Sequence, residues 1–220
     1  MILAYETSTN ICSVAFQNKE GEVWSKHVEG RGVHSDHVFL FTQEFMNEHE
    51  FAMGDLDAVL VSNGPGSYTG LRIAASALKG LLFGVEVDLF AVNTLASLAM
   101  VAEQGNAEVH AIIDARRTHV YHQAFTRGKR LEALGEAKLL EISELEDALK
   151  AGQSISGTGI NRLNKERLEG ISVYDNEFIS AESLLELYQL PNFKEYCVKT
   201  NVEALNPNYI SSSQINNTGA

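Results

Sequence analysis

Residues 2–29 read ILAYETSTNICSVAFQNKEGEVWSKHVE, and this stretch decides the fold class. It holds three strand patterns in a row, ILAYET, ICSVAFQN and EVWSKHVE, separated by the turn-like segments STN and KEG. Gly21 supplies the second turn, and apolar residues partly alternate with polar ones in the third pattern. The stretch predicts an antiparallel meander of three strands at the start of the fold.

Helices and strands alternate after this meander. Residues 34–49 have helical spacing, with Ser35 or Asp36 as the expected N-cap. The apolar run 56–62 suits a buried parallel strand, and a helix is expected from about Gly70 to Phe83. A strand at 88–93 and a helix at 94–104, capped by Thr94, complete the order β-β-β-α-β-α-β-α.

The pattern starts again near Gly105. Two strand patterns at 108–116 and 119–128 are followed by a helix at 142–152, a strand and turn at 154–159, a short charged helix, a strand at 171–175 and a helix at 180–188. The second half therefore resembles the first. We expect an α/β protein with two lobes, residues 1–105 and 106–220, the second ending in a polar, disordered tail at 211–220.

Composition limits the possible partners and location of the chain. Its 220 residues include 17 Lys and Arg against 29 Asp and Glu, a formal net charge of -12, which argues against tight direct binding to nucleic acid. Cys12 and Cys197 are isolated, so neither a disulfide framework nor a zinc spacing is present. The sequence shows no signal peptide and no apolar run long enough to span a bilayer. These features predict a cytoplasmic protein without a membrane partner.

A glycine-rich loop, NGPGSYTGLR at residues 63–72, has the composition of a phosphate site. The P-loop pattern fails because its lysine is absent, and the dinucleotide pattern fails because Thr69 occupies the third glycine position. The favoured interpretation is a tight turn whose Ser67 and Thr69 cap the next helix. An anion at the helix N-terminus is the alternative.

The helix after this loop is apolar on nearly all sides, and the helix at 34–49 has a similar excess. Small residues at 74, 75, 77 and 80 permit the close approach of another helix. We therefore expect a protein–protein interface on these two helices, the alternative being two ordinary core helices. The interface residues predicted are Val38, Phe41, Phe45, Leu71, Ala74, Ala75, Leu78 and Leu82.

The candidate catalytic and metal-binding residues form no recognisable set. His34 and His37 are three residues apart and lack an evident third ligand, so a metal site is not expected. Asp114, Arg116 and Arg117 suit a polar hairpin turn better than a catalytic centre. We expect no catalytic, cofactor-binding or metal-binding residues.

Five segments, in order along the chain, resemble the TsaB family: AYETSTNICSVAF at 4–16, NGPGSYTGLR at 63–72, NTLASLA at 93–99, IIDARRTHVY at 112–121 and PNYI at 207–210. The resemblance implies the two-lobed actin/Hsp70/sugar-kinase (ASKHA) fold, each lobe a mixed sheet flanked by helices. It also implies a non-catalytic subunit that binds and activates TsaD. That complex synthesises N6-threonylcarbamoyladenosine (t6A) in tRNAs that read codons beginning with adenosine. The implied partners are TsaD, the ATPase TsaE through the complex, and a second copy when the chain is alone. Contact with tRNA would occur only through the complex.

Three departures from related motifs bear on this expectation. The superfamily's phosphate turn, D-x-G-T, is replaced here by Glu6-Thr7-Ser8-Thr9. The His-x-x-x-His metal motif of TsaD has no counterpart at His34 and His37. The family's PxYLR ending is changed to Pro207-Asn208-Tyr209-Ile210-Ser211. The alternatives to an accessory subunit are an ATPase or kinase of this fold, and a metallopeptidase of the glycoprotease-like family.

Overall fold

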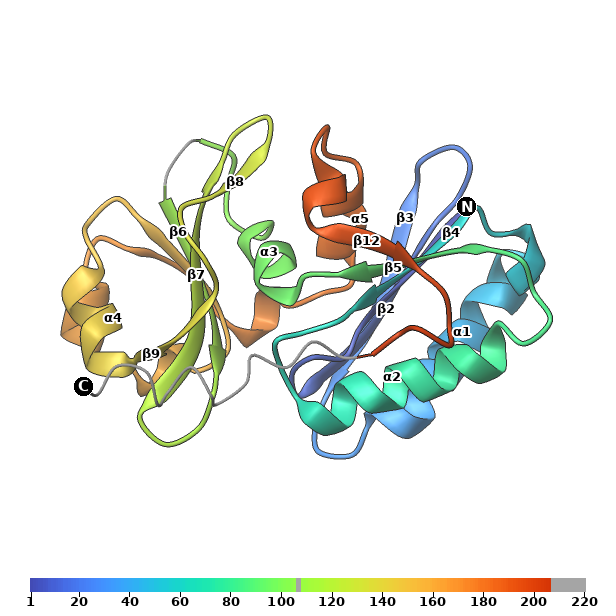
Figure 1. Cartoon of the computed structure of the whole chain (residues 1–220), viewed down its shortest axis with the longest axis horizontal. Helices are drawn as coiled ribbons and strands as arrows, with labels where there is room; N and C mark the ends of the chain where they lie inside the picture. The colour runs from blue at the N-terminus through green and yellow to red at the C-terminus, as the bar shows by residue number, and fades with distance from the viewer. Residues whose placement is uncertain (106–107, 207–220) are drawn as a thin grey trace.

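A computed structural model describes residues 1–105 and 108–206, and two mixed sheets flanked by helices organise it (Figure 1). The tail at 211–220 and the PNYI segment lie outside the described residues. The first sheet contains Ile2–Glu6 (β1), Ile11–Gln17 (β2), Val23–Glu29 (β3), Ala58–Ser62 (β4), Asp88–Val92 (β5) and Cys197–Thr200 (β12). Its strand order is β12-β5-β4-β1-β2-β3.

The second sheet contains Glu108–Asp114 (β6), His119–Arg127 (β7), Leu131–Ala133 (β8), Lys138–Glu141 (β9), Ser154–Gly157 (β10) and Ser172–Tyr174 (β11). Its order is β11-β10-β6-β7-β8, and β9 also pairs with β7. The α-helices are His34–Glu48 (α1), Tyr68–Leu81 (α2), Thr94–Ala99 (α3), Ile142–Ala148 (α4) and Glu182–Tyr188 (α5). Short 3₁₀ helices lie at Met53–Asp55, Ile160–Arg162, Lys165–Leu168, Asn176–Phe178 and Phe193–Glu195.

The predicted meander is confirmed. β1 pairs with β2 and β2 with β3, both antiparallel, whereas β4 joins β1 in parallel. The second sheet repeats this arrangement, because β6 pairs antiparallel with β7 and parallel with β10. Each lobe is therefore a mixed sheet with helices, as the sequence predicted.

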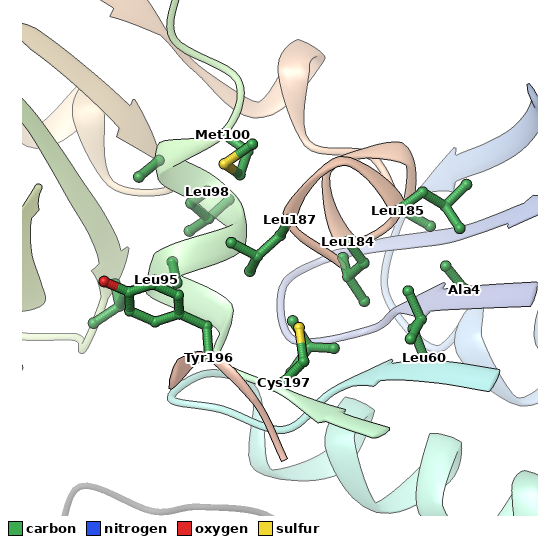
Figure 2. Close-up of a cluster of buried hydrophobic side chains, with 14 of the residues drawn as sticks. Ala4, Leu60, Leu95, Leu98, Met100, Leu184, Leu185, Leu187, Tyr196 and Cys197 are labelled. Atoms are coloured by element: carbon green, nitrogen blue, oxygen red, sulfur yellow. The ribbon is translucent and has the colours of Figure 1, made fainter. Parts of the chain in front are cut away.

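Helices cover both faces of the first sheet. α1 and α2 lie side by side on one face, while α3 and α5 lie between this sheet and the second one (Figure 1). The intervening layer is apolar: Leu60 of the first sheet, Leu95 and Leu98 of α3, Leu187 of α5 and Val109 of the second sheet belong to one buried cluster. Figure 2 shows Leu187 between α3 and α5. A single continuous core thus joins the two lobes.

The chain does not stay in the second lobe after residue 106. α5 packs on β1, β2 and β4, and β12 pairs with β5, so residues 182–200 return to the first lobe. The expected division at residue 105 precedes β6, the first strand of the second sheet, whereas residues 182–200 pack on the first sheet. Periodicity does not reveal where a four-residue strand such as β12 pairs, because the pairing depends on contacts distant in sequence.

The observed N-caps of α1 and α3 lie one to three residues before the predicted ones. α1 begins at His34, and its N-cap Val33 makes no side-chain cap bond, so neither Ser35 nor Asp36 has that role. The cap of α3 is Asn93, whose side chain accepts a hydrogen bond from the backbone of Ala96. Thr94 instead accepts one from the backbone N–H of Gly64 at 3.0 Å. Ser67 caps α2 as predicted, but Thr69, the other predicted cap, lies inside the helix, which begins at Tyr68 instead of about Gly70.

Candidate functional site

The altered phosphate turn, residues 6–9, is fully enclosed. Glu6, Thr7, Ser8 and Thr9 are all buried, at 5% exposure or less. The turn's backbone N–H groups have internal acceptors: Ser8 donates to Glu6 Oε1 at 2.6 Å and Thr7 donates to Ser62 Oγ at 3.1 Å. A phosphate-binding turn needs exposed N–H groups directed at the ligand. This turn directs one of them to its own Glu6 and the other to Ser62 of β4.

The glycine-rich loop closes over the same turn. The backbone N–H of Ser67 donates to Ser8 O at 2.6 Å. A Cβ atom at Gly66 would lie 2.3 Å from Ser8 O, and one at Gly70 would lie 2.0 Å from Thr7 O. The glycines therefore permit close packing of loop against turn. The loop that resembled a phosphate site packs on the superfamily's altered phosphate turn.

Glu6 is the charged group at the centre of this packing. Burial raises the pKa of its carboxyl to about 7, and the hydrogen bonds from Ser8 oppose the shift. Its Oε1 accepts two bonds from Ser8, whereas Oε2 has no protein partner in the structure. A carboxyl in such surroundings changes charge near neutral pH.

The predicted interface residues come together, but on the inner side of their helices. Val38, Phe45, Ala74, Ala75, Leu78 and Leu82 belong to the core cluster beneath α1 and α2, Leu71 is 2% exposed, and Phe41 is half-buried against the same cluster. Seven of the eight side chains are therefore buried in the lone chain, and their role as partner contacts stays a prediction. Both helices carry apolar residues on more than one side, so the spacing of these residues alone does not say which of them the sheet covers.

The outward side of the two helices keeps its own apolar surface. An open groove of about 390 Å³ runs between them. Phe39 is 47% and Tyr68 53% exposed beside it, and Phe83, just beyond α2, is 88% exposed. The Arg72 guanidinium lies 3.8 Å from the centre of the Tyr68 ring. The groove is lined by Ser35, Phe39, Tyr68, Thr69, Arg72, Ile73, Ser76 and Ala77.

Small residues continue this surface along α2. Ile73, Ser76 and Gly80 follow one stripe at helical spacing, and a Cβ added at Gly80 would meet nothing within 4 Å. We call Phe39 together with this stripe the outer face. Gly80 is one of the small residues that the sequence places on this helix, and only the structure separates it from Ala74, Ala75 and Ala77, which are buried.

The histidines near α1 do not form a metal site. His34 is buried and burial lowers the pKa of its ring, while His37 Nδ1 lies 2.9 Å from the carbonyl oxygen of Val33. Across residues 1–105 and 108–206, no group of three or more His, Cys, Asp or Glu side chains is arranged to hold a metal ion.

Asp114, Arg116 and Arg117 form the polar turn of the β6–β7 hairpin. Asp114 Oδ1 accepts a hydrogen bond from the backbone N–H of Arg116 at 2.7 Å and pairs with the guanidinium of Arg162. Arg116 and Arg117 have φ values of 68° and 51°, the left-handed conformation that a tight hairpin turn uses. The interpretation as a hairpin turn agrees with this geometry.

A buried histidine pair went unnoticed in the sequence. His110 Nδ1 and His122 Nε2, on neighbouring strands, lie 2.9 Å apart inside the second lobe. Burial lowers the pKa of His110 and, with the neighbouring charges of His110 and Lys138, lowers that of His122 to about 3. The residues are twelve apart, so only the register of the hairpin brings them together.

The comparisons with known proteins agree with this geometry. The family model described as TsaD, tRNA N6-adenosine threonylcarbamoyltransferase, matches residues 30–204. The tRNA threonylcarbamoyladenosine biosynthesis protein TsaB of Escherichia coli (strain K12) is 30% identical over 200 residues, which cover 84% of this chain and 84% of that protein. TsaB of Haemophilus influenzae is 33% identical over 137 residues, 61% of this chain and 58% of that protein.

Solved structures show the same architecture over nearly the whole chain. YeaZ from Pseudomonas aeruginosa superposes with a TM-score of 0.78 at 27% identity, covering 95% of this chain and 99% of that one. A second structure from that organism, described as an uncharacterized protein with similarity to peptidase YEAZ, gives 0.79 at 28% identity, covering 96% of this chain and 99% of that one. The fold is thus the two-lobed ASKHA class, as the resemblance implied. Within that class, the chain belongs to the TsaB family.

No helix in the two described ranges, 1–105 and 108–206, is both long and apolar enough to cross a membrane.

Proposed function

We propose that this protein is a non-catalytic subunit that binds and activates TsaD in the synthesis of t6A in tRNA. The name of the E. coli relative, a tRNA threonylcarbamoyladenosine biosynthesis protein, supports the pathway. The match to the TsaD family model supports a partner of the same fold, because related subunits often pair through equivalent surfaces.

The observation that carries the proposal is the outer face. Phe39 is about half exposed there, and the stripe of small residues leaves room for a second helix to approach α2 closely. An exposed apolar surface of this kind is typical of interfaces. When the chain is alone, the same face pairs two copies of it. TsaE and tRNA bind only through the complex with TsaD, which forms in the cytoplasm.

The enclosed turn supports a non-catalytic role. Residues 6–9 are buried beneath the loop at 63–72, so the place where this fold takes a nucleotide phosphate is occupied by protein atoms. We expect the purified chain alone not to hydrolyse ATP. Sustained ATP turnover that Glu6→Gln abolishes would favour the ATPase or kinase alternative, and metal-dependent peptide cleavage would favour a metallopeptidase.

The test is co-purification with the TsaD of the same organism, followed by a t6A assay with and without this chain. Gly80→Arg places a long charged side chain on the outer face where the lone chain has open space. Leu134→Arg is the matched control, since Leu134 is 51% exposed and lies in the second lobe. We expect the first variant to lose binding and stimulation and the second to keep both.

A further inference from the structure

The turn at residues 6–9 is linked to the first turn of α2 by a chain of hydrogen bonds. Glu6 Oε1 accepts from the backbone N–H and the hydroxyl of Ser8. Ser8 O accepts from the backbone N–H of Ser67 at 2.6 Å, and Ser67 Oγ accepts from the backbone N–H of Gly70 at 3.2 Å. The Glu6 carboxyl is therefore linked to the start of α2 through Ser8 and Ser67. The residues that follow Ser67 line the groove of the outer face.

Glu6 is an unusual group for this position. It is 1% exposed, and its Oε2 atom is buried without a protein partner in the structure. Burial raises the pKa of the carboxyl to about 7, so its charge changes within the neutral range. Hydrogen bonds to an ionised acceptor are roughly twice as strong as those to a neutral one. Ionisation of Glu6 therefore strengthens its hold on Ser8.

The titratable groups around Glu6 come from several elements. Burial raises the pKa of the Cys12 thiol on β2 to about 12, and burial lowers the pKa of the His34 ring on α1 below its ordinary value. In the sheet, Glu6 pairs with Ser13, and Ser13 pairs with the exposed His27 on β3. Glu182 of α5 bonds the Ser25 hydroxyl on β3, and the first turn of α2 has no acidic residue.

We propose that Glu6 is a positioning residue for the outer face: as the carboxylate, it holds the first turn of α2, through Ser8 and Ser67, in the conformation that pairs. This inference rests on the proposed function, because it concerns pairing through α2. Glu6 is fully buried before pairing, so a partner adds nothing to its desolvation. The direction of the pH dependence therefore follows from the stronger bonds that the carboxylate makes to Ser8. Pairing strengthens as pH rises through 7 and releases a proton.

The experiment measures pairing at pH 6.5 and pH 8, both of the chain with itself by sedimentation equilibrium and with TsaD by calorimetry. We expect pairing about three- to tenfold tighter at pH 8 for the unmodified chain, and the same affinity at both pH values for Glu6→Gln. Glu186→Gln is the matched control. Burial also raises the pKa of that carboxyl, but it pairs with Arg127 and lies on α5, on the other face of the sheet.

Each result supports or contradicts the role of Glu6. Equal affinity at both pH values in the unmodified chain, or a pH dependence that survives Glu6→Gln, overturns the proposal. So does a pH dependence that disappears in His27→Gln. Ser8→Ala keeps the carboxyl and removes the hydroxyl bond, so a reduced pH dependence in this variant supports the proposal even if Glu6→Gln does not fold. Failure to pair at either pH overturns the proposed function instead.

Discussion

The two buried histidines of the second lobe make the folded state less stable as pH falls. Burial lowers the pKa of both rings, and His122, with a pKa of about 3, stays neutral inside the fold until the medium is strongly acidic. In the unfolded chain the same ring takes up a proton near its ordinary pKa of 6.5. Between these two values the unfolded state binds more protons, so stability falls as pH falls.

This difference predicts the behaviour of His122→Gln, which keeps a side chain able to bond His110 but does not titrate. The unmodified chain should lose about 2 kcal/mol more stability than the variant between pH 6.5 and pH 5. Urea unfolding at the two pH values measures the difference. His119→Gln, at a partly exposed histidine of the same strand, is the control and should behave as the unmodified chain does. Equal pH dependence in His122→Gln and the unmodified chain would contradict the account.

At the scale of one helix, α2 uses its glycines for opposite purposes. Gly70 lies against the backbone of Thr7, whereas the space at Gly80 is open. Gly80→Ala should stabilise the chain by about 0.5–1 kcal/mol, the usual gain at an exposed helical position. Gly70→Ala should destabilise the chain by several times that amount. Thermal unfolding of the two variants at low protein concentration tests this. A Gly70→Ala variant as stable as the unmodified chain would show that the loop does not pack on the turn as described.

The same helix shows what the sequence predicts and where prediction stops. Spacing and capping residues located α2 and its cap Ser67, because both depend on neighbours within one turn. Leu71, Ala74 and Leu78 are expected at a partner interface from the sequence, but they are buried in the lone chain. The apolar residues of α2 spread over several sides, whereas its exposed polar residues Thr69, Arg72, Ser76 and Lys79 recur at helical spacing and mark the solvent side. Spacing does not predict β12 or the His110–His122 pair, because both depend on strand pairing between distant segments.

At the scale of the whole molecule, the two lobes share one core. Leu95 and Leu98 of α3 and Leu184 and Leu187 of α5 lie in the cluster that also contains residues from both sheets (Figure 2). A shared core of this kind makes the lobes a single cooperative unit, because neither can unfold without exposing the other's apolar surface. It also resists the opening of one lobe against the other.

Leu187→Ala tests this cooperativity. Leu187 is fully buried, and its truncation should cost about 2–5 kcal/mol and lower the unfolding midpoint without splitting the transition. Hydrogen exchange should then quicken in β4 of the first sheet and β6 of the second to the same extent. Leu145→Ala, at the buried residue of α4 and outside the shared cluster, is the comparison. Faster exchange confined to one sheet in Leu187→Ala would show that the lobes unfold separately.

The central claim is that the outer face of α1 and α2 binds TsaD, and one measurement tests it most directly. The affinity of TsaD for the unmodified chain, Gly80→Arg and Leu134→Arg is measured with each variant's fold checked by circular dichroism. The account predicts that Gly80→Arg folds normally but binds TsaD at least about tenfold more weakly, while Leu134→Arg binds as the unmodified chain does. A folded Gly80→Arg that binds TsaD with unchanged affinity would contradict it.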